Sequence, residues 1–152
     1  MHARVFPTIV MMDTEIGDRL IEDRVHLVIL HQPSDAFYAQ ILIERMRSLH
    51  GPRLGGLAWQ AEPIAYGTFD AQTPATAIYL FPAPPLTIIQ SAQLATRRGL
   101  VSFGYEETSG ENGVMASLFV GRSSTPWLNI ETIRQSGIIF KPTLIQISRR
   151  YP

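Results

Sequence analysis

Short apolar runs alternate with helical patterns through the first two thirds of the chain, and this alternation constrains the fold more than any other feature. Residues 25–30 (VHLVIL) form a continuous apolar run rich in β-branched side chains, which is typical of a strand buried on both faces. Runs at residues 57–66, 77–81 and 100–103 indicate three further extended segments. Strands that alternate with helices favour a parallel sheet with right-handed crossovers, so we expect an α/β domain.

Two helices are predicted between these strands. The first follows a break at residues 32–35, where Ser34 or Asp35 can cap its N-terminus, and it ends before a Gly-Pro pair. The second begins in the proline-rich segment 82–85, because proline is tolerated in a first helical turn, and Gly99 is its expected C-cap. The apolar residues that recur at helical spacing, and that we expect to face the sheet, are Phe37, Tyr38, Ile41, Leu42, Met46 and Leu49, followed by Leu86, Ile89, Ala92 and Ala95.

The pattern changes in the C-terminal third. Residues 114–120 alternate weakly as a strand and Trp127 begins another, which predicts an antiparallel pair at one edge of the sheet. Asn129 should cap a following helix, and Gly137 fits the position just after that helix. A last helical stripe should pack on the sheet while two arginines stay in water, and these residues are Leu144, Ile147 and Tyr151, with Arg149 and Arg150. The expected architecture is a single three-layer domain, with a mainly parallel sheet, a C-terminal antiparallel pair and flanking helices.

Composition limits the class of protein. A length of 152 residues fits one domain with one hydrophobic core, so residues 1–152 are treated as a single unit. Hydrophobic residues make up 45% and charged residues 17% of the chain, as in globular proteins. The formal net charge is zero and the basic residues are spread out, which argues against a nucleic-acid partner. No apolar run approaches the length of a membrane span, so no membrane insertion is expected.

Motifs that suggest metal or cofactor binding lack the residues that this chemistry needs. Segment 51–56 has the glycine spacing of a P-loop, but Leu57 and Ala58 stand where the motif needs Lys and Ser or Thr. Segment 13–18 is acidic, yet Arg24 stands where a calcium loop needs its bidentate Glu, so we expect a solvated loop. The chain has no cysteine, which rules out disulfides and thiolate metal sites. We predict no metal and no cofactor.

No group of residues has the pattern of a catalytic site. Segment 99–104 differs by one residue from the spacing of a nucleophile elbow, and Ser102 lies inside a predicted strand rather than at its end. His26 and His31 are five positions apart on one strand, so they project to opposite faces and cannot share a metal. An enzyme would need a convergent acid, base or nucleophile. We therefore predict that the chain is not an enzyme, and a hydrolase or transferase is the least supported reading.

The carboxyl ends of the parallel strands are the predicted ligand site. Ligands of open α/β sheets bind there, at the edge where the strand order reverses. Phe81 and Pro82 follow the third predicted strand and offer apolar walls. The candidate polar residues, which can equally be ordinary loop and capping residues, are His31, Gln32, Asp35, Tyr105, Glu106 and Asn112.

A second candidate surface lies near the N-terminus. Val5, Phe6, Ile9 and Val10 form a short apolar cluster outside the predicted strands. We predict that this cluster is exposed and contacts a protein partner or a second copy of the chain, giving a homodimer.

Five segments of the C-terminal half resemble the YfiR/HmsC-like family of periplasmic proteins. They are LVSFGY at 100–105, GVMASLFV at 113–120, WLNI at 127–130, GIIF at 137–140 and LIQIS at 144–148. Their order is similar to the family pattern of a G-x-M strand, a strand ending in Asn, a helix, a Gly and a final apolar helix. The strand–helix units before them agree in order and spacing. Family members often carry cysteine pairs, which this chain lacks, and an N-terminal aromatic-Pro stretch, in whose place this chain has MMDTEIG at 11–17.

The resemblance implies a small periplasmic α/β domain that acts by binding and is not an enzyme. Such proteins regulate membrane-bound cyclic-di-GMP synthases or sit beside two-component sensors, so an inner-membrane signalling protein is the expected partner, with a small-molecule ligand as a further possibility. The first residues do not read as a signal peptide, so the chain is either cytoplasmic or already processed. The alternative function is a small-molecule-binding component of an uptake system.

Overall fold

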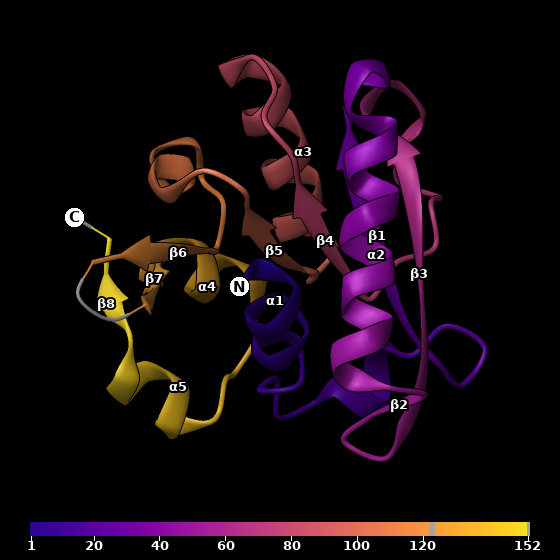
Figure 1. Cartoon of the computed structure of the whole chain (residues 1–152). Coiled ribbons are helices and arrows are strands. Elements are labelled where there is room, and N and C mark those ends of the chain that lie inside the picture. Colours follow the sequence, from indigo (N-terminus) through magenta and orange to yellow (C-terminus); the bar gives the residue numbers. More distant parts are fainter. Residues whose placement is uncertain (122–123, 152) are drawn as a thin grey trace.

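An eight-stranded sheet in the order β2-β3-β1-β4-β5-β6-β7-β8 runs through the computed structural model, which describes residues 1–121 and 124–151 (Figure 1). β1 pairs in parallel with β3 and β4, β4 with β5, β5 with β6, and β7 with β8, whereas the β2–β3 and β6–β7 pairs are antiparallel. The α/β prediction and the antiparallel C-terminal pair are confirmed. The strands are β1 (Val25–His31), β2 (Arg53–Leu54), β3 (Leu57–Ala65), β4 (Ala77–Leu80), β5 (Val101–Gly104), β6 (Ala116–Val120), β7 (Ser124–Leu128) and β8 (Arg149–Arg150).

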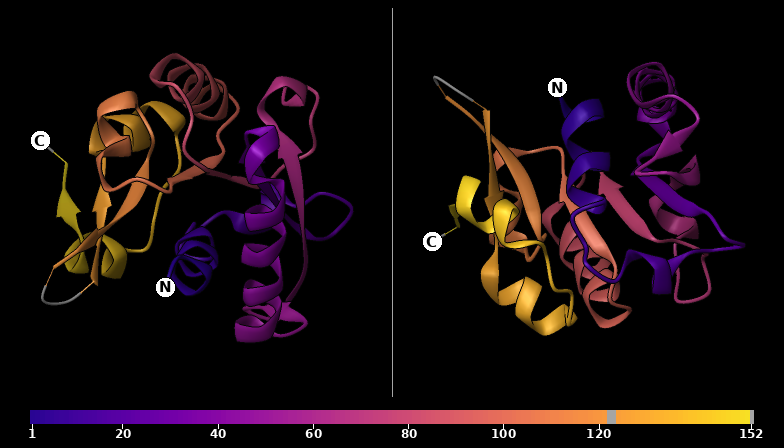
Figure 2. Two further views of the ribbon diagram at one scale, coloured as in Figure 1. Left: turned by 45° about the horizontal axis from the view of Figure 1, so that its top comes forward. Right: turned by 90° about the horizontal axis from the view of Figure 1, so that it is seen from below.

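Helices cover both faces of this sheet. α1 and α2 pack on one face and α3 on the other, with α4 beside α3 (Figure 2). The continuous apolar run of β1 reflects this arrangement, because Leu27 and Ile29 enter the core under α1 and α2 while Val28 and Leu30 enter the core under α3. The helices are α1 (His2–Val10), α2 (Ala36–His50), α3 (Pro85–Arg97), α4 (Ile130–Ser136) and α5 (Pro142–Ile147). Short 3-10 turns are η1 (Ile16–Arg19), η2 (Pro33–Asp35), η3 (Tyr66–Thr68) and η4 (Glu107–Asn112).

The chain winds outward from β1 in both directions. After β1 it crosses through α2 to β3 on one side, then returns past β1 to β4 and crosses through α3 to β5 on the other side. The strand order therefore reverses between β1 and β4. The carboxyl ends of these strands point toward the upper side of Figure 1, where α2 and α3 begin.

The N-terminal segment is a core helix, so the predicted partner surface was wrong. Phe6 and Val10 are fully buried and Ile9 is nearly so, while Val5 is half-buried against the same core. The Phe6 ring centroid lies 5.4 Å from that of Tyr79 on the sheet. Apolar residues at helical spacing bury one face of a helix, and here that face covers the sheet instead of meeting another molecule.

The faces of α2 and α3 differ from the predicted stripes. Phe37 is 70% exposed, Tyr38 59%, and Leu86 64%, although all three were expected to face the sheet. Met46, Ala92 and Ala95 are buried as predicted, and the stripes are completed by residues that the prediction left out, Ala39 and Ile43 in α2 and Ile88 and Ser91 in α3. Both helices therefore present large apolar side chains to solvent at their N-terminal ends.

The C-terminal elements agree with the prediction for α4 but not for the tail. Asn129 caps α4, since its Oδ1 accepts a hydrogen bond from the Thr132 amide at 3.0 Å, and Gly137 follows the helix with φ of 77°. α5 ends at Ile147, and the two arginines after it form β8, paired in parallel with β7. The tail is thus a sheet element rather than a longer helix. Within the described residues, no helix is long and apolar enough to cross a membrane.

Segment 13–18 is also less solvated than predicted. The Asp13 side chain is buried, and its Oδ2 accepts a hydrogen bond from Arg19 Nε at 2.7 Å. Its Oδ1 accepts a second bond from the Glu15 amide at 3.0 Å. These bonds give the carboxylate a structural role, since a buried charge needs partners.

Candidate functional site

A hollow of about 230 Å³ lies beyond the carboxyl ends of β1, β4 and β5, where the strand order reverses. We call it the carboxyl-edge hollow. Its walls come from the start of α2, from the segment after β4 and from the residue that follows β5. The lining residues are Asp35, Tyr38, Phe81, Pro82 and Tyr105.

Aromatic side chains dominate the hollow. The Phe81 and Tyr105 rings stack with centroids 5.7 Å apart and an interplanar angle of 21°. Tyr105 is 50% exposed and Tyr38 59%, so both rings can accept a further partner. Phe37 lies next to Tyr38, with ring centroids 5.8 Å apart in an edge-on arrangement. Asp35 is the one charged residue among those that line the hollow.

Two of the predicted ligand residues, Asp35 and Tyr105, reach the hollow. His31 does not, because its ring is buried and its Nδ1 donates a hydrogen bond to the Gln32 carbonyl at 2.8 Å. Gln32 ends the same strand but does not line the hollow, and its carbonyl also accepts from the Asp35 amide at 2.9 Å. Both residues therefore shape the β1–α2 turn.

Glu106 and Asn112 line a smaller crevice of about 70 Å³, between the start of α3 and η4. Phe81 and Pro82 belong to both the crevice and the hollow. The six predicted polar residues thus divide between the hollow, its neighbouring crevice and the turn that supports them.

Neutral hydroxyl groups lie next to the hollow and hold its wall in place. The Tyr66 hydroxyl donates a hydrogen bond to the Phe81 carbonyl, which anchors the segment after β4. Burial, together with the Asp35 and Glu106 carboxylates, raises the pKa of Tyr66, so this hydroxyl keeps its proton at neutral pH. Burial likewise raises the pKa of Tyr79.

His2 joins this support from α1. Its ring centroid lies 5.7 Å from that of Tyr105, and its Nδ1 is 2.6 Å from the Tyr79 hydroxyl. Burial lowers the pKa of His2, which favours the neutral imidazole as the hydrogen-bond partner of the Tyr79 hydroxyl. An aromatic cluster therefore continues from the core to the rim of the hollow.

Sequence reasoning missed Tyr38 because it assigned every large apolar residue of the helix to one buried stripe. Phe37 and Tyr38 are adjacent, and neighbouring positions on a helix point about 100° apart. A stripe that includes both residues is therefore wider than the one face of the helix that packs on the sheet. The small Ala39 is the residue of this turn that faces the core. A strict spacing of Ala39, Ile43 and Met46 would have left both aromatic residues outside.

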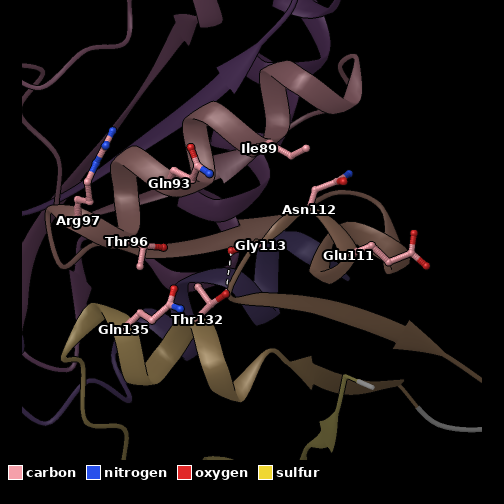
Figure 3. A pocket seen from close by; sticks show the side chains of 9 residues that line it. All are labelled: Ile89, Gln93, Thr96, Arg97, Glu111, Asn112, Gly113, Thr132 and Gln135. Carbon is pink, nitrogen blue, oxygen red and sulfur yellow. Dashed lines mark hydrogen bonds between the residues drawn. The ribbon is translucent and has the colours of Figure 1, made fainter.

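A larger concavity of about 550 Å³ lies between α3, α4 and the end of η4, and we call it the α3–α4 groove (Figure 3). Its lining is mainly polar. The Thr132 hydroxyl donates a hydrogen bond to the Gly113 carbonyl at 3.1 Å, which ties α4 to the segment after η4 (Figure 3). Asn112 alone among the predicted site residues lines this groove. The other polar lining residues are Gln93, Thr96, Arg97, Glu111 and Gln135.

Comparison with known proteins identifies the fold and no family. No family model matches the sequence, and no curated protein matches it. A conserved domain protein from Vibrio cholerae O1 biovar eltor has a similar structure, with a TM-score of 0.59 and 14% identity, over 90% of this chain and 57% of that one. An ABC domain from Streptococcus pneumoniae, solved in complex with L-Trp, has a TM-score of 0.56 and 11% identity, over 93% of this chain and 61% of that one. The chain thus spans less than two thirds of either protein.

Proposed function

We propose that this domain is a binding module that takes a small aromatic molecule into the carboxyl-edge hollow. The observation that carries the proposal is the exposure of Tyr38 and Tyr105, 59% and 50%, around a hollow at the reversal of strand order. Exposed rings gathered at this edge leave apolar surface that a ligand can cover. An aromatic pair gains about 0.5–1.5 kcal/mol beyond the burial of its area.

The single carboxylate in the lining narrows the class of ligand. Asp35 offers acceptor oxygens and a negative charge in the hollow that Tyr38 also lines. A ligand that combines an aromatic ring with an ammonium group would stack on the tyrosines and pair with Asp35. L-Trp has both groups, and the Streptococcus pneumoniae neighbour was solved with it, so L-Trp is the first probe.

Isothermal titration calorimetry tests this proposal. We expect L-Trp to bind the wild-type domain, and Tyr38→Ala and Asp35→Asn each to weaken binding about tenfold, since each removes one of the two recognised groups. Leu49→Ala is the matched control, because Leu49 is also exposed on α2 but lies at the opposite end of that helix. Equal L-Trp affinity in Tyr38→Ala and the control would place the ligand elsewhere, and no binding of L-Trp, L-Tyr, L-Phe or indole would reject the proposed ligand class.

We further propose that binding serves regulation, as in the YfiR/HmsC-like family. The domain would act in the periplasm as a non-enzymatic sensor and modulate an inner-membrane signalling protein of the cyclic-di-GMP or two-component type. The support is the sequence resemblance, whose five segments follow the family order: they cover β5, β6, the end of β7 with the start of α4, the connection between α4 and α5, and α5. A ligand that fills the hollow would cover the exposed side chains around it, and this would change the surface that a partner protein contacts.

Affinity capture from detergent-solubilised envelopes of the native host tests the regulatory role. The expected result is recovery of one integral-membrane signalling protein, with an amount that changes when L-Trp is added. Recovery of no signalling protein above the untagged control would contradict it.

The uptake component remains the second candidate, favoured by the similarity of fold to the ABC domain. It predicts the same binding of L-Trp, together with recovery of a membrane transporter in place of a signalling protein. The identity of the captured membrane protein separates the two candidates.

A further inference from the structure

The α3–α4 groove has a chemistry unlike that of the carboxyl-edge hollow. Arg97 lies at one end of the row of lining side chains and Glu111 at the other (Figure 3). Side-chain amides of Gln93, Asn112 and Gln135 lie between these charges (Figure 3). None of the described residues that line the groove is aromatic. A ligand here would be recognised by charge and hydrogen bonds.

The threonine hydroxyls of the wall already donate their hydrogen bonds. Thr96 donates to the Ala92 carbonyl at 2.8 Å, within α3. Thr132, which is buried, donates to the Gly113 carbonyl at 3.1 Å. They hold the walls in place and offer a ligand only lone pairs, because each hydroxyl has a single hydrogen.

The amides and the guanidinium are the groups open to a ligand. Within residues 1–121 and 124–151, the side chains of Gln93, Asn112 and Arg97 form no hydrogen bond or ion pair with the protein. The Gln135 amide donates to Glu131 Oε1 at 3.1 Å, which leaves its carbonyl oxygen free to accept. The groove therefore presents both donors and acceptors between its two charges.

We infer that the α3–α4 groove binds a short peptide with free termini. The peptide carboxylate would meet Arg97, whose planar fork of donors fits a carboxylate, and the terminal ammonium would meet Glu111. A peptide bond carries one donor and one acceptor, which matches the side-chain amides of Gln93 and Asn112.

The order of the lining side chains favours an extended ligand. Arg97 ends α3 and Glu111 lies in η4, with the amides of the groove between them. A single amino acid carries both charged groups on one carbon, so it would leave the amides between Arg97 and Glu111 without a partner. Glu111 also lies beside the Tyr151 hydroxyl, but a carboxylate has about four lone-pair sites, so this contact leaves capacity for an ammonium group.

Calorimetric titration with trialanine tests the inference, with N-acetylated and C-amidated trialanine as comparisons. We expect trialanine to bind the wild-type domain with a Kd of about 1 mM or tighter. Arg97→Gln should weaken the binding of trialanine about tenfold and change the binding of the C-amidated peptide little. Glu111→Gln should likewise weaken the binding of trialanine and change the binding of the N-acetylated peptide little. Arg4→Gln, an exposed arginine of α1, is the control for a general change in charge.

Three results would overturn the inference. They are no binding of trialanine at that affinity, equal binding of the capped and free peptides, and an equal effect of Arg97→Gln and Arg4→Gln. The inference is independent of the proposed aromatic site, because Tyr38→Ala should leave trialanine binding unchanged. Failure of L-Trp to bind would likewise leave it standing.

Discussion

Two ion pairs, compared residue by residue, show how strongly burial changes the contribution of an ion pair to stability. The Asp13–Arg19 pair has a carboxylate side chain with 0% exposure and a guanidinium with 22%, whereas the Glu131–Arg134 pair has side chains exposed by 58% and 71%. Water and salt screen the second pair, so it contributes little to stability. The Asp13 carboxylate also holds the Glu15 amide, so its removal leaves two donors without their partner.

Asp13→Ala should therefore destabilise the fold while Glu131→Ala should not. We expect Asp13→Ala to lower the free energy of unfolding by about 2 kcal/mol, because removing one member of a buried, hydrogen-bonded pair leaves unsatisfied polar groups. Urea unfolding followed by circular dichroism measures both variants. Equal unfolding midpoints for the two would contradict the structural role assigned to Asp13.

At the scale of elements, the α4 cap ties two parts of the C-terminal half together. Asn129 Oδ1 accepts from the Thr132 amide at 3.0 Å, and Asn129 Nδ2 donates to the Gly110 carbonyl in η4 at 3.1 Å. Asn129→Ala loses both bonds and should lower the free energy of unfolding by about 1–2 kcal/mol. Asn129→Asp keeps the capping oxygen and loses the donor, so urea unfolding should place it between wild type and Asn129→Ala. A stability of Asn129→Asp equal to that of the alanine variant would show that the cap contributes nothing.

The strands were predictable from the sequence, and the surface of the helices was not. A short continuous apolar run such as residues 25–30 predicts a strand in a sheet that is covered on both faces, and the same argument identified the parallel strands after it. Helical patterns are less specific. Phe37 and Tyr38 fit a broad stripe as well as an exposed pair, and hydrophobicity alone does not separate the two arrangements.

The predicted α1 surface failed for a related reason. The cluster of Phe6, Ile9 and Val10 has the spacing of a helix face, but the sequence does not show which segment covers the sheet beside α2. The tail was misjudged because Arg149 and Arg150 form a two-residue edge strand, whose pairing depends on β7 being adjacent in space. Such long-range pairing has no local signal.

At the scale of the whole molecule, the candidate site follows from topology. The rule that ligands bind beyond the carboxyl ends of parallel strands at a reversal of strand order led to Asp35 and Tyr105. The same rule included His31, which the structure buries under the turn with its Nδ1 bonded to the Gln32 carbonyl. Strand order thus identifies the edge of the sheet, and side-chain exposure then identifies the residues that can meet a ligand.

Titration of the ¹⁵N-labelled domain with L-Trp, followed by amide chemical shifts, tests the central claim most directly. Binding in the carboxyl-edge hollow predicts that the largest shifts fall on the amides around Asp35, Phe81 and Tyr105, which come from three separate segments that meet only in the fold. The amides of α5, far from that edge, should not move (Figure 1). Shifts confined to the α3–α4 groove, or no shifts at saturating L-Trp, would contradict the assignment of this hollow as the aromatic binding site.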